Sequence, residues 1–184
     1  MSVDQASWES AVRHLYEDAF AYVASGPRMH RDWRADVLAV MEHAVPDPRG
    51  WAGLDDHAGD PERTVRPAHP FRELTAETLA ERLFEIDRAS AEDLLLALTD
   101  DGCTLRNLDR FDESPDEMRE VARTVLARYG DTITCHTNIT AHSGTLDFGA
   151  PREAWRPVTV YSEDTGLVVV SATEVGLFWN FADY

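Results

Sequence analysis

Lysine is absent from this chain, and all 17 of its cationic side chains are arginines. Against them stand 34 aspartates and glutamates, so the formal net charge at pH 7 is −17. A surface this negative repels nucleic acid and anionic membranes, and it attracts basic partners. The missing lysine, together with a single glutamine, is typical of a GC-rich genome and says nothing about function.

Long hydrophobic runs are absent as well. The longest purely aliphatic segments, residues 94–98 and 167–170, are far too short to span a bilayer. The first twenty residues are interrupted by charges and contain no apolar stretch typical of a secretory signal. We therefore expect no membrane association and a cytoplasmic location.

Cysteine is scarce, and sequence signatures of catalysis are missing. Cys103 and Cys135 lack metal-binding or Cys-x-x-Cys spacing, so we expect both to be reduced and buried. The chain has no phosphate-binding glycine loop and no Gly-x-Ser-x-Gly motif. A short acidic run with one histidine consists of Asp55, Asp56, His57 and Asp60. It lacks the residue order of a calcium-binding loop, so we interpret these side chains as exposed to solvent. We expect no cofactor and no metal.

The composition nevertheless supports a folded core. Hydrophobic residues make up 43% of the 184 residues, which suits one domain over residues 1–184. Helical periodicity dominates residues 1–130, apart from a loop over 46–73 that contains five of the nine prolines. Residues 131–184 have the period of a β-meander. This order predicts an α+β fold in which the helices pack on one face of an antiparallel sheet of about four strands.

Five helices carry the pattern that predicts the helical part. Trp8, Val12 and Leu15 begin a stripe that continues to Val23 and stops at Gly26. The second helix begins near residue 33 and ends before Pro46, and the third resumes at residue 75 with its apolar face reaching residue 86. A short helix capped by Ser90 follows, and Ser114-Pro115-Asp116-Glu117 predicts the start of a further helix by a capping box.

The strands are predicted after residue 130 only. The period changes to two from residue 132, and further strands are expected over 158–162, 167–172 and 175–181. Residues 163–166 have the composition of a hairpin turn. On the last strand we expect one side to be buried, with Val175, Leu177, Trp179 and Phe181.

The first strand of this meander carries a polar face made of His136, Asn138, Thr140 and His142. Two interpretations remain open: a ligand-binding or acid–base site, and the solvated face of an amphipathic strand. His136 and His142 would lie about 20 Å apart on a straight strand, so they cannot share one metal ion. His136 and Asn138 could converge on one ligand.

Acidic residues are concentrated over residues 92–120, where ten acids against three arginines give a charge of −7. This segment is a docking face for a basic protein or a nucleic-acid mimic, or else a set of ordinary solvated helix starts. The acids best placed to reach a partner flank a connection between two helices: Asp100, Asp101, Asp109, Asp112 and Glu113.

Two functions follow from these observations. The first is a small acidic cytoplasmic binding protein, of the inhibitor or immunity type, that neutralises a basic protein partner. The second is a small-molecule-binding domain or enzyme that uses the strand face around His136 and Asn138. We expect no nucleic-acid binding in either case; Arg28, Arg31 and Arg34 form the only dense arginine cluster.

Overall fold

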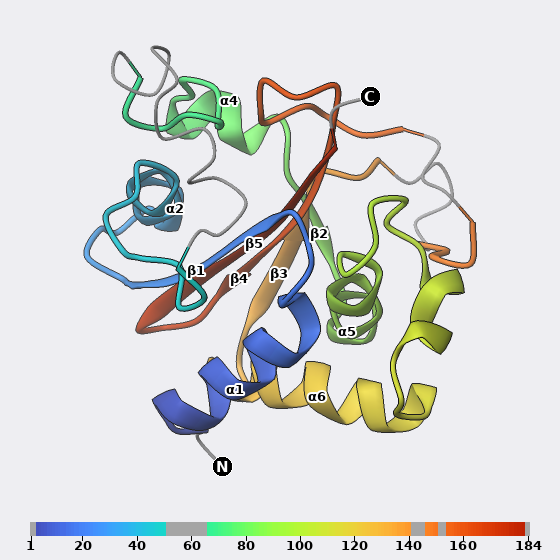
Figure 1. Ribbon diagram of the computed structural model, residues 1–184. Coiled ribbons are helices and arrows are strands. Elements are labelled where there is room, and N and C mark those ends of the chain that lie inside the picture. The colour runs from blue at the N-terminus through green and yellow to red at the C-terminus, as the bar shows by residue number, and fades with distance from the viewer. Residues whose placement is uncertain (1–2, 51–65, 141–145, 151–153, 183–184) are drawn as a thin grey trace.

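A computed structural model describes residues 3–50, 66–140, 146–150 and 154–182. At its centre lies a five-stranded antiparallel sheet with the order β1-β5-β4-β3-β2 (Figure 1). The strands are β1 (Ala21–Pro27), β2 (Phe84–Ile86), β3 (Thr134–Thr137), β4 (Glu163–Val170) and β5 (Glu174–Ala182). Strands β2 to β5 form a meander, and β1 is added at its β5 side.

Helices cover both faces of the sheet. The helical elements are α1 (Gln5–Tyr16), α2 (Trp33–Met41), α4 (Ala76–Ala80), α5 (Arg88–Ala97), the 3-10 helix η2 (Leu105–Arg110) and α6 (Pro115–Ala127). Helices α1, α5 and α6 lie on one face, and α2 and α4 lie on the other (Figure 1). Strand β4 therefore contributes alternate residues to two cores, Leu167 and Val169 to one and Val168 and Val170 to the other. None of the described helices is long and apolar enough to cross a membrane.

The α+β class and the antiparallel sheet are confirmed, with three corrections. The sheet has five strands rather than about four, and β1 and β2 come before residue 130. The helices pack on both faces rather than one. The expected burial on β5 is confirmed, since Val175, Leu177, Trp179 and Phe181 are all buried in the core beneath α2 and α4.

Strand β1 was missed because its sequence does not alternate. Tyr22, Val23 and Ala24 are all buried, since the sheet is covered on both sides, so no period of two appears. Val23 continues the three- and four-residue spacing of α1 by coincidence, and α1 ends at Tyr16. Strand β2 has only three residues, too few to establish a period, and it begins where the third helix was expected to continue.

Local capping signals predicted helix starts well in one case and poorly in another. Ser114 and Glu117 form the expected capping box of α6, with Pro115 in the first turn. For α5 the cap is Asp87 rather than Ser90: its carboxylate accepts a hydrogen bond from the Ser90 N–H at 2.7 Å. Asp87 lies three positions before Ser90, and an N-cap side chain usually accepts a hydrogen bond from the backbone N–H two or three residues further along the helix.

The predicted turn at residues 163–166 and the strand at 158–162 are both wrong. Residues 163–166 form the start of β4, and Gly166 pairs with Trp179 of β5. The turn between β4 and β5 is instead made by residues 171–173, where the Ser171 hydroxyl accepts the Glu174 N–H at 2.9 Å. Within 158–162 the only strand-like pairing in the described chain is a single bridge between Thr159 and Phe71.

Candidate functional site

The five acids predicted to contact a partner lie in one connection, the segment from the end of α5 through η2 to the start of α6. Asp100 is half-buried and serves the connection itself: it accepts hydrogen bonds from the Asn107 amide at 2.8 Å and from the Thr104 hydroxyl at 3.4 Å. Asp101, Asp109 and Asp112 are exposed, and within the described chain no ion pair includes them. Within this connection Asp100 therefore has a structural role, whereas Asp101, Asp109 and Asp112 face solvent.

Glu113, the fifth acid, contacts a different helix. Its Oε1 lies 3.1 Å from His14 Nε2 on α1, and both side chains are a little more than one-third exposed. His14 also lies beside Phe111, with ring centroids 6.0 Å apart. This contact joins the acidic connection to the last turn of α1.

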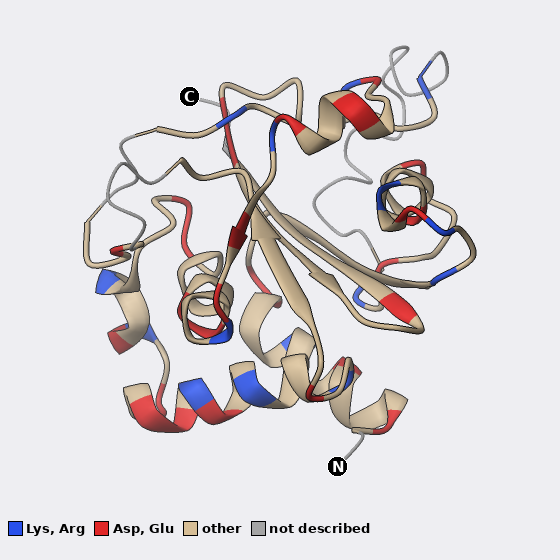
Figure 2. Cartoon of the chain, turned by 180° about the vertical axis from the view of Figure 1, so that it is seen from behind, with Lys and Arg blue, Asp and Glu red and all other residues tan. Residues whose placement is uncertain are grey.

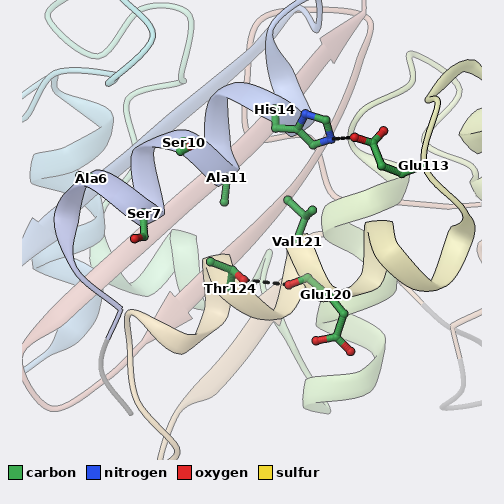
Figure 3. A pocket seen from close by; sticks show the side chains of 9 residues that line it. All are labelled: Ala6, Ser7, Ser10, Ala11, His14, Glu113, Glu120, Val121 and Thr124. Atoms are coloured by element: carbon green, nitrogen blue, oxygen red, sulfur yellow. Dashed lines mark hydrogen bonds and ion pairs between the residues drawn. The ribbon is translucent and has the colours of Figure 1, made fainter.

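A surface groove of about 680 Å³ begins at this contact and runs between α1 and α6 (Figure 3). Its α1 side is made of small side chains and His14, and its α6 side carries two carboxylates, Glu113 and Glu120. The remaining lining residues are Ala6, Ser7, Ser10, Ala11, Val121 and Thr124. Sequence analysis missed this groove; the available signal was the run of small residues on the exposed side of an amphipathic helix.

The arginines of the described chain are largely engaged within the protein. Several pair with carboxylates: Arg28 with Asp36, Arg49 with Asp47, Arg119 with Asp93, Arg123 with Glu92 and Arg128 with Glu174. Others donate to backbone carbonyl oxygens: Arg72, Arg82, Arg106 and Arg110. Acidic and basic turns alternate along α6, while acidic segments outnumber basic ones over the chain (Figure 2). Because most of these arginines already have partners within the protein, the unpaired charges of the described chain are mainly those of aspartates and glutamates.

The alternative site on β3 is not assembled as predicted. Asn138 is buried, and its amide donates to Asp164 Oδ1 at 2.7 Å and to the Arg156 and Asp164 carbonyls, while its oxygen accepts the Gly166 N–H at 3.0 Å. Its side chain therefore holds segments of the fold together. Thr140 lies beyond the end of β3, and His142 falls outside the described residues.

His136 is half-buried beside Trp33, the first residue of α2. Its ring stacks on Trp33, with centroids 4.6 Å apart and planes inclined by 25°. Burial lowers the pKa of His136 below its ordinary value, an effect that the nearby Glu85 opposes and Arg34 reinforces. The ring of His136 is therefore partly covered by Trp33 rather than fully solvated.

Neither cysteine has the environment of a nucleophile. Both are buried in the core beneath α1, α5 and α6. Burial raises the pKa of Cys135 to about 11, so its thiol stays protonated at neutral pH. Among the described residues no group of three or more His, Cys, Asp or Glu side chains is placed to hold a metal ion. The acidic run of Asp55, Asp56, His57 and Asp60 lies outside those residues.

Comparisons with protein-family models, with curated proteins and with solved structures find no match for this chain.

Proposed function

We propose that this protein is a small acidic binding module that neutralises a basic protein partner in the cytoplasm, as an inhibitor or immunity-type protein does. The observation that carries the proposal is the group of three exposed acids, Asp101, Asp109 and Asp112, in the single connection between α5 and α6. The whole chain has a net charge of −17, and most of its described arginines already form ion pairs or hydrogen bonds within the protein.

The physical argument is long-range attraction. Unpaired surface charges of one sign accelerate encounters with an oppositely charged protein, by about tenfold to a thousandfold at low ionic strength. Carboxylates that already pair with a neighbouring arginine contribute little to this field. The alternative of a ligand site at His136 and Asn138 has weaker support, because the hydrogen-bonding groups of Asn138 are used within the fold.

The test replaces the three exposed acids by lysine, as Asp101→Lys, Asp109→Lys and Asp112→Lys together. A matched control reverses three exposed acids elsewhere, Glu73, Glu77 and Glu81, beside and within α4 on the other face of the sheet. Both triple variants change the net charge equally, so only the position of the charge differs.

Immobilised wild-type protein and both variants are exposed to a lysate of the source organism, and association rates are then measured with the retained protein. We expect a basic partner that binds the control more than about tenfold faster than the first variant at low salt, with the difference shrinking as salt screens it. Retention of no basic protein by wild type, or equal rates for the two variants, contradicts the proposal.

A further inference from the structure

The groove between α1 and α6 is shallow and open to solvent along its length. Helices α1 and α6 run antiparallel: His14 near the end of α1 meets Glu113 before the start of α6 (Figure 3), and at the other end Arg128 donates to the side-chain oxygen of Gln5. On α1 the lining residues extend from Ala6 to His14, which is about 12 Å at the rise of an α-helix. Two turns of a third helix fit along such a valley.

Small side chains leave the floor of the groove open. Ser7 and Ser10 are exposed, and with Ala6 and Ala11 they give α1 a low surface at every lining position but His14. The arginines of α6 do not line the groove: Arg119 pairs with Asp93 and Arg123 with Glu92, both on α5. A helix can therefore approach this floor closely, as ridges pack into grooves between helices.

The charge of the groove selects a cationic occupant. Its lining contains the carboxylates of Glu113 and Glu120 and contains no arginine. Among the described residues Glu113 pairs with His14 and Glu120 with Arg123, and exposed ion pairs of this kind contribute little stability. An arginine or lysine from a partner can replace either pairing at small cost.

Other occupants fit less well. An extended peptide needs free backbone groups at a sheet edge, whereas the walls of this groove are helices whose backbone groups are already hydrogen-bonded. A second copy of the chain would bring a net charge of −17 against the same acidic walls.

We propose that the groove between α1 and α6 binds an α-helix of the basic partner, with separate cationic side chains of that helix meeting Glu113 and Glu120. This inference rests on the proposed function and adds to it the secondary structure of the bound segment and the place where it docks.

The test uses a synthetic amphipathic helical peptide with arginines one turn apart along one face, and a scrambled peptide of the same composition. Two variants change the groove: Ser10→Trp fills it, and Glu120→Gln removes one carboxylate without changing its shape. Two controls make equal changes on α4, Ala80→Trp and Glu81→Gln, at exposed positions on the opposite face of the sheet. Thermal unfolding monitored by circular dichroism verifies that all four variants are folded.

We expect the helical peptide to bind wild type more tightly than the scrambled one, and to shift the amide NMR signals of α1 and α6. Ser10→Trp should weaken binding about tenfold, the effect of losing about 1.4 kcal/mol of binding free energy, and Glu120→Gln about threefold. The α4 controls should match wild type. Equal affinity for both peptides, or equal effects of Ser10→Trp and Ala80→Trp, overturns the inference.

Binding measurements with the natural partner distinguish a failure of this inference from a failure of the proposed function. If reversal of Asp101, Asp109 and Asp112 slows its association while Ser10→Trp leaves binding unchanged, the function stands and the groove is not where the partner docks. If neither change affects any partner, both proposals fail.

Discussion

The side-chain amide of Asn138 donates a hydrogen bond to Asp164 Oδ1 at 2.7 Å, and both side chains are buried. Asp164 Oδ2 accepts three more hydrogen bonds, from the Val158 and Thr159 N–H groups at 3.0 and 2.6 Å and from the Thr159 hydroxyl at 2.8 Å. This carboxylate thereby connects β4, the residue after β3 and the segment around residue 158, which has little regular structure of its own.

Replacing Asp164 by asparagine should destabilise the fold. The new NH₂ group would face N–H and O–H donors in a buried site, and leaving such groups unsatisfied costs at least about 2 kcal/mol. Urea unfolding of Asp164→Asn measures this loss. The control is Glu163→Gln, the neighbouring half-exposed acid, for which we expect a change below about 0.5 kcal/mol. Equal effects of the two substitutions would mean that the buried hydrogen bonds of Asp164 add nothing to the free energy of unfolding.

A second constraint lies where Gly166 pairs with Trp179 across β4 and β5. The indole ring lies directly over the glycine, and a Cβ at residue 166 would come within 1.9 Å of it. We expect Gly166→Ala to destabilise the protein by about 1–3 kcal/mol, as other overpacking substitutions do. Trp179→Leu should also destabilise it, because a large buried side chain is truncated.

The two substitutions should not be additive. Leucine at residue 179 removes the ring that the alanine methyl would strike, so Gly166→Ala should cost less in the Trp179→Leu background than in wild type. A double-mutant cycle from urea unfolding measures this coupling. If the losses of unfolding free energy from the two substitutions are additive, the glycine at residue 166 is required by the backbone of the sheet and not by the indole ring.

These two contacts also explain what the sequence could and could not predict. Gly166 was interpreted as a turn residue because glycine readily adopts the positive φ of a hairpin turn. Its actual role depends on Trp179, which becomes its neighbour only after folding. Asn138 was assigned to a polar strand face by alternation alone. Its burial depends on Asp164, twenty-six positions away in sequence, and on a second layer of helices that pattern analysis did not anticipate.

Some features specified within a few residues were predicted correctly. The capping box of Ser114 and Glu117 and the buried side of β5 both follow from local spacing. The connection that carries Asp101, Asp109 and Asp112 was likewise located from the helices on either side of it. The groove could not be predicted, because it requires α1 and α6, about one hundred residues apart in the chain, to lie side by side.

His136 should titrate below the ordinary histidine pKa of about 6.5, since it is half-buried against Trp33. Because the folded state binds this proton more weakly than the unfolded state, stability should fall as the pH decreases below 6.5 and level off below the folded pKa. NMR titration of the ring signals measures the midpoint directly. Trp33→Ala should expose the ring and move the midpoint up toward 6.5, and His136→Gln should remove this part of the pH dependence of stability. A wild-type midpoint at or above 6.5 contradicts this prediction.

Binding to generic duplex DNA or RNA should be undetectable at physiological salt. Association with a polyanion requires several free cations that displace counterions, and the arginine cluster at residues 28–34 does not supply them. Arg28 donates to Asp36 and to the Ser171 carbonyl, and Arg34 pairs with Asp32, which leaves Arg31 exposed. Fluorescence anisotropy of a short labelled duplex, titrated with protein from low to physiological salt, measures any binding. A rise in anisotropy that weakens with added salt, and that Arg31→Ala abolishes, would show that this cluster presents enough positive charge to overcome a net charge of −17.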